Sequence, residues 1–468
     1  MIRALIGAGM DVARLNFSHG THEEHRAAFA TLRSAAQEIG RNVAVMTDLQ
    51  GPKIRTGPLK NGGPVDLEEG ASLCLTTRDV PGDASCVSTT YGGFPNDVRA
   101  GDRILLDDGK MELQVEQVAP PDVLCRVVRG GPLYEHKGIN LPGVRVSSPS
   151  LTPKDLEDLA LAVELGADYV ALSFVRSPDD IDDIRKHIER ICAAQGGNRE
   201  PPGVVAKIEH PEALDHFDAI LRLSDAVMVA RGDLGIELDL EDVPQIQKDL
   251  IRRCNDRGVP VITATQMLES MVHSARPTRA EVTDVANAIY DGTDAVMLSG
   301  ETAVGRYPYQ AVRFMADIAA KADAAVVARP EERKLAPLGP DRTAGSHSDA
   351  IGAAVSRMSR TLDVARVVCF TQSGYTARAI SRYRPQTPVT AITLTDETLR
   401  RCALIWGVNA LKSQEVQDID DVIVGADNLM LENHLAARGD TIIIVAGTPL
   451  AMAGRTNLLS LHVVGEST

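Results

Sequence analysis

Between residues 150 and 326 the sequence repeats one pattern five times: a short apolar segment, a tight turn and a longer amphipathic segment. Helix-start signals recur in it, as at Ser177-Pro178, where a hydroxyl precedes a proline that suits the first helical turn. The pattern therefore predicts five strand–helix units in a row, which form a parallel sheet buried on both faces. The predicted strands cover residues 168–173, 204–207, 226–229, 260–264 and 294–298.

Two further apolar segments, 12–16 and 43–48, precede this run and are separated by a helix-like stretch over 22–39. They bring the predicted barrel strands to seven, whereas a closed (β/α)8 TIM barrel has about eight. Residues 1–8 read as the end of an amphipathic helix, so the strand that should precede that helix is missing. We expect an α/β fold built on such a barrel, with either a start codon upstream of Met1, which we favour, or an open barrel edge.

Residues 57–146 change to alternating apolar and polar positions, which predicts a small β domain with a hairpin turn at Asp108-Gly109. Its predicted strands cover 72–77, 103–107, 111–117 and 124–128. The domain interrupts a strand–helix connection at the C-terminal face of the barrel, where a hinged lid excludes water.

A polar stretch that contains prolines, 329–348, predicts a linker to a second α/β domain. The strands of that domain are expected near 367–370, 389–394, 441–445 and 461–464. The predicted division is therefore a barrel domain (1–52 and 150–328), an inserted lid (53–149), the linker, and a C-terminal regulatory domain (349–468).

The charge of the chain restricts its partners. A net charge of −15 argues against nucleic acid and anionic membranes, because both bind basic surfaces. An anionic substrate therefore needs a local positive site. The seven cysteines contain no CxxC pair, which predicts neither a disulfide framework nor a zinc site and favours the cytoplasm. Apolar stretches such as 442–446 are too short to cross a bilayer.

Charged residues follow two of the predicted strands directly. Lys207 and Glu209 end one strand, and Asp233 follows the next strand. Because parallel barrel strands deliver their C-terminal residues to one mouth, we expect an ammonium and two carboxylates to meet there. Such a group suits a phosphate or an enolate bound to a metal ion. The alternative is a buried Lys–Glu pair with a purely structural role.

The motifs around these strand ends are long, and related motifs run from the first residues of the chain to the last. These segments are DVARLNFSHG (11–20), DLQGPKIRTG (48–57), AKIE (206–209), MVARGDLGIE (228–237), TATQMLESM (263–271), RPTRAE (276–281) and MLSGETA (297–303). Together they resemble the motifs of the pyruvate kinase family of bacterial type. The resemblance implies a TIM barrel, an inserted β lid, a C-terminal α/β domain that often binds a sugar-phosphate or nucleotide effector, and usually a homotetramer.

The resemblance also implies an activity, the transfer of the phosphoryl group of phosphoenolpyruvate to ADP to give pyruvate and ATP. Lys207 and Arg14 would then neutralise charge on the phosphoryl oxygens. Glu209 and Asp233 would bind Mg2+ or Mn2+ through their hard oxygen atoms. The amides of Gly232 and Asp233 would hold the substrate's carboxylate at a helix N-terminus.

By the same resemblance, Thr265 lies near the carbon that receives a proton after phosphoryl transfer. A hydroxyl is a poor acid, so we expect Thr265 to orient a water, with Ser299 and Glu301 as a relay. The alternative is that Thr265 is a β-branched residue that simply ends a strand.

The sequence has no glycine-rich phosphate loop that would hold a nucleotide. The resemblance places Arg55 at the hinge of the lid and Asp108 and Lys137 on the lid itself, all near the nucleotide phosphates, and adds Asn16 and His19 to the nucleotide site. Taken alone, Asp108 is a turn residue and Lys137 a solvated charge.

Lys53 departs from the part of the family that requires K+, in which this position usually holds Glu. The residues that match the family's monovalent-cation cage are Asn16, Ser18, Asp48 and the carbonyl of Leu49. A nearby ammonium supplies the positive charge that the ion would bring, so we expect activity without added K+. The alternative is an exposed hinge charge, with K+ still required.

In the last domain, Thr371, Ser373, Gly374 and Thr376 lie between a predicted strand and a helix that should begin near Ala377. Hydroxyls and amides then converge at a helix N-terminus, which favours an anion. These residues match the family's effector phosphate pocket.

Two other functions compete with the kinase. A Mg2+-dependent lyase or aldolase that acts on a pyruvate enolate would use a similar acidic metal site but would need no nucleotide. A catalytically impaired regulatory relative is the second alternative, and only the missing first strand supports it.

Overall fold

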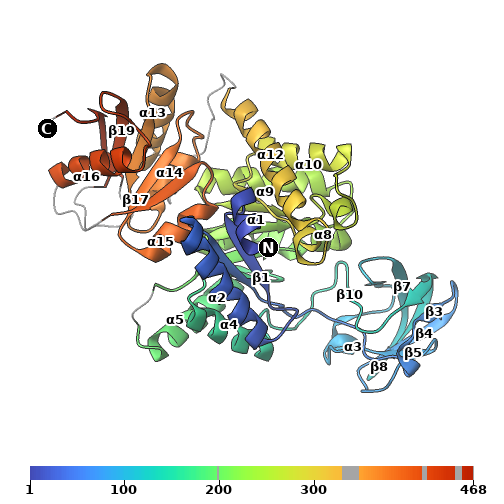
Figure 1. The fold of residues 1–468 in the computed structure, drawn as a ribbon. Coiled ribbons are helices and arrows are strands. Elements are labelled where there is room, and N and C mark those ends of the chain that lie inside the picture. Colours follow the sequence, from blue (N-terminus) through green and yellow to red (C-terminus); the bar gives the residue numbers. More distant parts are fainter. Residues whose placement is uncertain (198–199, 329–346, 414–418, 448–455, 467–468) are drawn as a thin grey trace.

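The computed structural model describes residues 1–197, 200–328, 347–413, 419–447 and 456–466. Within these residues the strands form sheets of seven, six, five and two strands. The seven-stranded sheet forms the central body, the six-stranded sheet stands to one side of it, and the five-stranded sheet lies at the other end (Figure 1).

All strands of the seven-stranded sheet are parallel, and they follow one another in chain order. This confirms the predicted parallel barrel and its seven strands. The last strand is shorter than the predicted 294–298, although the amide of Met297 still donates to the carbonyl of Thr263 at 3.0 Å. The strands are β1 Val12–Asn16, β2 Ala44–Asp48, β11 Tyr169–Leu172, β12 Gly203–Ile208, β13 Ala226–Ala230, β14 Val261–Ala264 and β15 Ala295–Val296.

Helices surround this sheet, and local signals fix where they begin. Thr21, Thr152 and Thr278 each cap a helix in a capping box with the acidic residue three positions later. The first helix packs against α2 and α12, the helices at the two ends of the sheet (Figure 1). The helices are α1 Ile2–Ala8, α2 His22–Ile39, α4 Pro153–Leu165, α5 Pro178–Ala194, α6 Pro211–Asp215, α7 Phe217–Leu223, α8 Arg231–Glu237, α9 Val243–Arg257, α10 Arg279–Asp291, α11 Gly300–Ala303 and α12 Pro308–Val327, with the 3-10 turn η2 Glu269–Val272.

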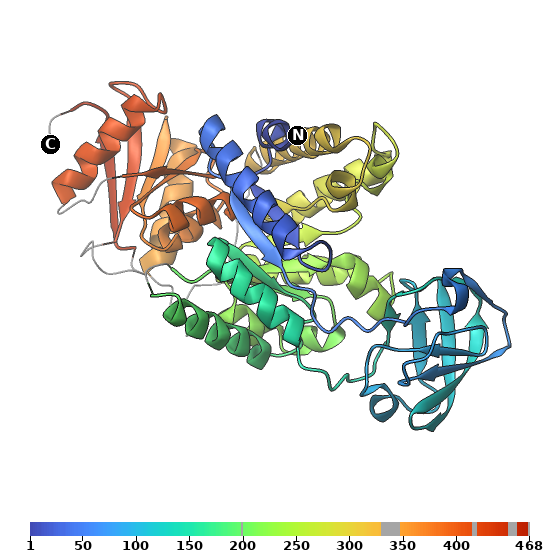
Figure 2. The ribbon, with the colours of Figure 1, turned by 60° about the horizontal axis from the view of Figure 1, so that its bottom comes forward.

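The lid interrupts the barrel between β2 and α4, as the sequence predicts. Figures 1 and 2 show it beside the barrel, joined to it by two chain segments. Asp107 and Asp108 both have positive φ in the hairpin turn between β6 and β7, which confirms a turn at this position. The lid elements are η1 Lys60–Gly62, β3 Val65–Leu67, β4 Ser72–Thr76, β5 Cys86–Ser88, α3 Phe94–Asp97, β6 Arg103–Leu106, β7 Met111–Ala119, β8 Asp122–Arg129, β9 Gly131–Leu133 and β10 Ile139–Asn140.

The C-terminal five-stranded sheet has the order β18-β17-β16-β19-β20, and only β20 is antiparallel. The prediction missed β18, because a half-exposed edge strand has little apolar alternation. The predicted linker is wrong at its end, since His347 and Ser348 are helical; the rest of it lies outside the described residues. The elements are α13 His347–Thr361, β16 Arg366–Phe370, α14 Tyr375–Ser381, β17 Val389–Thr393, α15 Asp396–Arg401, η3 Cys402–Leu404, β18 Val408–Lys412, α16 Ile419–Glu432, β19 Thr441–Ala446 and β20 Leu458–Val463.

Charged contacts join this C-terminal part to the barrel. Arg384 donates to Asp294 at 2.9 Å and its guanidinium lies over the ring of Trp406. Arg400 donates to Asp168, which directly precedes β11, at 2.7 Å. None of the described helices is both long and apolar enough to span a membrane. All seven cysteines are described, and each is a free thiol.

Candidate active site

The side chains at the C-terminal ends of β2 and β12 converge on Lys207. Its ammonium lies 2.9 Å from Glu209 Oε1 and 3.2 Å from Asp48 Oδ1. Arg14, from the neighbouring β1, donates to the other oxygen of Asp48 at 2.6 Å. Lys207, Glu209 and Asp48 are buried, so these charges are screened only weakly by solvent. The structure therefore brings together Lys207 and Glu209, as the strand-end pattern predicts, and adds Asp48 and Arg14 to them.

These contacts set the protonation of the cluster. Burial lowers the pKa of Lys207, but the carboxylates of Asp48 and Glu209 outweigh it and hold that pKa above its ordinary value. Burial likewise raises the pKa of Asp48, yet Lys207 and Arg14 more than offset it and lower the pKa. The ammonium is consequently charged near neutral pH and remains available to an anionic substrate.

Asp233 lies at the start of α8, directly after β13, and is about a quarter exposed. Its Oδ1 is 3.6 Å from the ammonium of Lys53. Burial raises the pKa of Glu209, and the charge of Asp233 raises it further, so the two carboxylates repel each other across the site. A hard divalent cation between them would relieve that repulsion, and the donor set therefore fits Mg2+ or Mn2+.

The protein alone offers this cation few ligands. Within the part of the chain that the structure describes, no group of three or more His, Cys, Asp or Glu side chains is arranged to hold a metal ion. Glu209 also accepts a hydrogen bond from the amide of Phe174 (2.8 Å), which fixes one of its oxygens. A metal at this position would need substrate and water for its other ligands, as is usual for Mg2+.

Thr265 follows β14 in a left-handed backbone conformation (φ 70°), where a β-branched residue is strained. Its Oγ1 accepts the amide of Gly232 at 2.8 Å and donates to the carbonyl of Ala264 at 2.7 Å. Arg231 Nη2 donates to the carbonyl of Thr265 at 2.7 Å, and its Nη1 to Asp284 at 2.7 Å. The Arg231 guanidinium thus holds the strained turn in place.

Ser299 and Glu301 lie at the start of α11, but their contacts are with the backbone. The carboxylate of Glu301 is buried and accepts the amides of Ser299 (2.7 Å) and Leu268 (3.1 Å). This geometry favours Glu301 as the group that holds two loops together. A relay through Ser299 and Glu301 stays a prediction.

The predicted nucleotide residues Arg55, Asp108 and Lys137 come from neighbouring segments of the lid and its hinge. Arg55 and Gly138 pair in an isolated bridge, and Arg55 donates to the carbonyl of His136 at 3.2 Å. Lys137 is bound to Asp107 at 3.0 Å. A Cβ added at Gly138 would lie 3.5 Å from Lys53 Cε and 3.9 Å from Asp108 Oδ1, so the lid turn and Lys53 are close neighbours.

The remaining predicted residues are arranged as follows. The side-chain oxygen of Asn16 accepts a hydrogen bond from the amide of Ser18 (3.1 Å), and the carbonyl of Leu49 accepts one from Ser173 Oγ (2.7 Å). His19 is exposed, and its carbonyl accepts a hydrogen bond from His25. Lys53 pairs with Asp233, whereas Asp48 of the cation cage pairs with Arg14 and Lys207. The positive charge near the cage therefore comes from three side chains.

In the C-terminal domain, Thr371 and Thr376 are buried and Ser373 is exposed. Gly374 has a φ of 79°, and α14 begins at the next residue, so the predicted start near Ala377 is wrong by two positions and Thr376 belongs to the helix. The hydroxyl of Thr456 donates to Thr376 Oγ1 at 3.2 Å.

Three contributors were missed in the sequence. Ser173 accepts a hydrogen bond from Lys207 at 2.6 Å, Phe174 donates its amide to Glu209, and Arg231 holds Thr265. Ser173 and Phe174 follow β11, so the rule that strand ends supply the site would have included them. Arg231 lies inside the quoted segment 228–237, but its partners come from two other elements.

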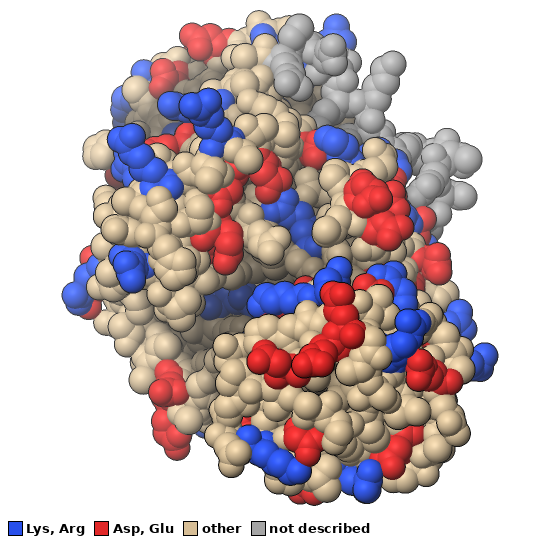
Figure 3. All heavy atoms as spheres, turned by 90° about the vertical axis from the view of Figure 1, so that its right-hand side faces the viewer, with Lys and Arg blue, Asp and Glu red and all other residues tan. Residues whose placement is uncertain are grey.

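The lid and the barrel enclose a hollow lined in part by Lys and Arg side chains (Figure 3). The C-terminal mouth of the barrel thus holds buried cations and two carboxylates, and an inserted lid lies beside it. This arrangement defines the class of protein: phosphotransferases that handle anionic substrates with a divalent metal. Comparisons with known proteins then give the family.

The sequence profile described as "Pyruvate kinase, barrel domain" matches residues 1–312, and "Pyruvate kinase, alpha/beta domain" matches residues 349–462. Pyruvate kinases of Staphylococcus saprophyticus and Staphylococcus aureus are 46% and 45% identical over 468 residues, covering 100% of this chain and 78% of each relative. A crystal structure of a pyruvate kinase from Cryptosporidium parvum is similar with a TM-score of 0.88 and 36% identity, covering 99% of this chain and 92% of that one.

The chain belongs to the pyruvate kinase family. It is thus a kinase, with phosphoenolpyruvate and ADP as the substrates that the family name implies, and members of the family generally require a divalent metal ion. The resemblance predicted from the motifs is confirmed.

Proposed function

We propose that this chain moves the phosphoryl group of phosphoenolpyruvate to ADP with the strand-end cluster of β1, β2, β12 and β13 as its catalytic site. The observation that carries this is the buried Lys207 ammonium, which lies within 3.2 Å of two carboxylates and remains charged. Phosphoryl transfer is mainly a matter of position and charge, and a fixed buried cation meets that need without a nucleophile.

In the proposed reaction, the bond from the enol oxygen to phosphorus breaks while a terminal phosphate oxygen of ADP bonds to phosphorus. Lys207 and Arg14 neutralise charge on the phosphoryl oxygens. The released enolate then takes a proton on its methylene carbon to give pyruvate. Thr265 orients the water that supplies this proton: its hydroxyl donates to the Ala264 carbonyl, and its oxygen accepts from the water once the Gly232 amide binds substrate.

Glu209 and Asp233 are proposed to hold Mg2+ or Mn2+, which when bound supplies a Lewis acid beside the substrate's carboxylate and enol oxygen. The amides at the start of α8 bind that carboxylate, which requires the Gly232 amide to exchange Thr265 Oγ1 for substrate. Arg55, Asp108 and Lys137 approach the ADP phosphates from the hinge and the lid.

Three further proposals rest on the family resemblance. The enzyme functions without added K+, it is a homotetramer, and the loop from Thr371 to Thr376 binds the phosphate of a sugar-phosphate or nucleotide effector. The charge of Lys53, 3.6 Å from Asp233, supports the first of these.

The test is pyruvate formation from phosphoenolpyruvate and Mg2+, with and without ADP, in the wild type and in Lys207→Met. A kinase forms pyruvate only with ADP, and the variant should be inactive. Lys186→Met on the exposed face of α5 is the matched control. Nucleotide-independent turnover of a pyruvate enolate would instead establish the lyase alternative, and an inactive wild type would support the impaired relative.

A further inference from the structure

A second group of cationic side chains lies around a cavity at the other face of the barrel. The cavity has a volume of about 310 Å³ and is formed by the ends of α7 and α9, by α5 and by α14. Ser224 and Asp225 directly precede β13, and Gly258 and Val259 are separated from β14 only by Pro260. The cavity is therefore at the N-terminal ends of the strands whose C-terminal ends carry Asp233 and Thr265.

Four arginines and one aspartate line this cavity: Arg185, Arg222, Arg257, Arg378 and Asp225. The lining therefore has a formal charge of +3, in a chain whose net charge is −15. Asp225 is already committed to the protein, because its Oδ2 accepts Arg185 at 2.6 Å and the amide of Val204 at 2.8 Å. No carboxylate of the lining is therefore left for Arg222 and Arg378.

Arginines at this junction between barrel and C-terminal domain are otherwise bound to carboxylates. Arg384 binds Asp294, Arg400 binds Asp168, and Arg382 binds Asp349. In contrast, neither Arg222 nor Arg378 forms an ion pair with any residue that the structure describes. The charges of Arg222 and Arg378 are therefore available to an anion in the cavity.

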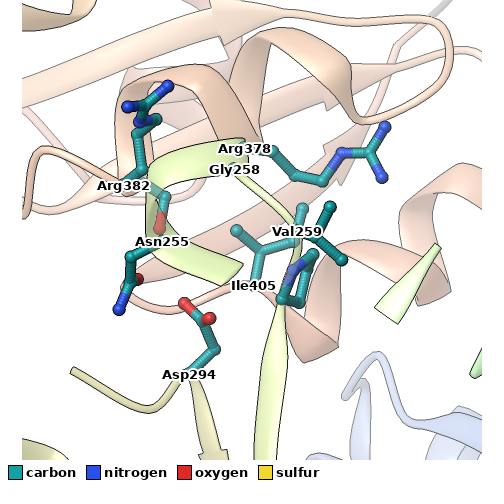
Figure 4. A pocket seen from close by; sticks show the side chains of 9 residues that line it. Asn255, Gly258, Val259, Asp294, Arg378, Arg382 and Ile405 are labelled. Atoms are coloured by element: carbon teal, nitrogen blue, oxygen red, sulfur yellow. The ribbon is translucent and has the colours of Figure 1, made fainter. Parts of the chain in front are cut away.

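The direction of Arg378 supports a ligand in the larger cavity. Figure 4 shows a small cavity next to it, where Asn255, Asp294 and Arg382 lie on one side of Val259. Arg378 extends past Val259, away from Asp294 and Arg382. It therefore does not turn to the nearby carboxylate, and it is a lining residue of the larger cavity as well.

We propose that this cavity, which we call the arginine pocket, binds a phosphorylated small molecule between the barrel and α14. Guanidinium forks suit phosphate oxygens, because each presents two parallel donors. A volume of about 310 Å³ is at the lower end of the range for small-molecule sites, roughly 300–1,000 Å³, which suits a sugar phosphate or a nucleoside monophosphate and excludes a macromolecule.

The arginine pocket is distinct from the sites described above. It lies at the opposite ends of β13 and β14 from Asp233 and Thr265, and its lining includes none of the predicted effector residues Thr371, Ser373, Gly374 and Thr376. Two of its lining residues, Tyr375 and Arg378, nevertheless belong to α14, the helix that also contains Thr376. The proposal does not depend on the catalytic roles given under the proposed function, since a bound phosphate is measured directly.

The experiment is isothermal titration of the full chain with three probes: inorganic phosphate, ribose 5-phosphate and adenosine monophosphate. The double variant Arg222→Gln/Arg378→Gln removes the two unpaired charges, and Arg313→Gln on α12 changes the charge of an exposed arginine elsewhere. We expect at least one organic phosphate to bind the wild type and the Arg313→Gln chain equally, and the double variant about tenfold or more weakly, as befits loss of charged hydrogen bonds.

The variant Thr376→Val separates this site from the loop between β16 and α14. Retained binding in Thr376→Val together with loss in the double variant supports the arginine pocket. Binding that is lost in Thr376→Val but unchanged in the double variant would assign the ligand to the loop and overturn the proposal, as would absence of binding for all three probes. Circular dichroism and basal kinase activity check that each variant folds, because neither Arg222 nor Arg378 belongs to the catalytic cluster.

Discussion

Lys53 Nζ lies 3.6 Å from Asp233 Oδ1, so an ammonium from the hinge of the lid neutralises a proposed metal ligand of the barrel. Both side chains are only about a quarter exposed, and Lys53 Cε also lies close to the lid at Gly138. The charge of Lys53 therefore lies between the barrel mouth and the lid.

This pair predicts activity in a buffer that contains tetramethylammonium in place of K+. Lys53→Glu should lower that activity about tenfold or more, because two unit charges at 4 Å interact by about 1 kcal/mol in water and by more at a partly buried site. Added K+ should restore much of it. Lys60→Glu, which alters an exposed lid lysine paired with Asp83, is the control. A wild type that needs K+ would refute the prediction.

Lys207→Met should reduce kcat by about 10³-fold or more, since a cation on the transferring phosphoryl group is worth that much in other phosphotransferases. The same change leaves Glu209 without its buried partner, so the free energy of unfolding should fall by about 3 kcal/mol. Steady-state kinetics and urea titration measure the two effects. A variant that keeps wild-type kcat would remove Lys207 from the proposed site.

Arg231 is predicted to be a positioning residue, because it contacts the backbone of Thr265 and no reacting group. Arg231→Met should lower kcat about tenfold or more and leave KM for ADP nearly unchanged, as expected when a group that acts in the transition state is displaced. Arg231→Lys should recover part of kcat, since it still reaches one carbonyl. Equal changes in kcat and both KM values would indicate general damage to the fold.

The paired Asp48 predicts a loss of stability in acid. Lys207 and Arg14 overcome the effect of burial and lower the pKa of Asp48 in the folded chain below its ordinary value of 3.8. The contribution of Asp48 to the free energy of unfolding is therefore complete above pH 3.8, and it is lost as the pH falls through the pKa of the folded state. Urea unfolding between about pH 5 and pH 2 should show a shallower pH dependence in Asp48→Asn than in the wild type. Identical slopes would contradict the prediction.

Arg384→Met should loosen the C-terminal domain from the barrel. The change removes three contacts of Arg384: the ion pair with Asp294, the hydrogen bond to the carbonyl of Gly292 and the contact with the ring of Trp406. Because the side chains of Arg384 and Asp294 are only 4% and 9% exposed, we expect a loss of about 3 kcal/mol in unfolding free energy and faster proteolysis between the domains. Arg252→Met on the exposed face of α9 should have little effect.

Much of the barrel follows from local sequence. Short apolar segments that end in charge predict the seven parallel strands, and signals such as Ser177-Pro178 predict where helices such as α5 begin. The same segments place Lys207, Glu209 and Asp233 at one mouth, because all strands of the sheet run in parallel. Hydrophobic period and capping act within a few residues, so they can be read from the chain.

The contacts between side chains could not be predicted in this way. Lys53 pairs with Asp233 across 180 positions of sequence, Lys137 pairs with Asp107, and the carboxylate of Glu301 is taken by two amides. Each partner comes from another element, and its distance depends on how sheets and helices pack. The edge strand β18 was missed for the same reason, since its pairing with β17 and not its own pattern makes it a strand.

The arginine pocket shows most clearly which features the sequence predicts and which depend on the tertiary structure. Its cations come from α5, α7, α9 and α14, and in the sequence Arg222 and Arg378 look like ordinary helical surface charges. The sequence by itself determined the order of the elements, the barrel and the residues at its strand ends, because periodicity, caps and strand direction are local properties. Only the tertiary structure decided which charges are paired and which face an open cavity, because that depends on distances between elements far apart in the chain.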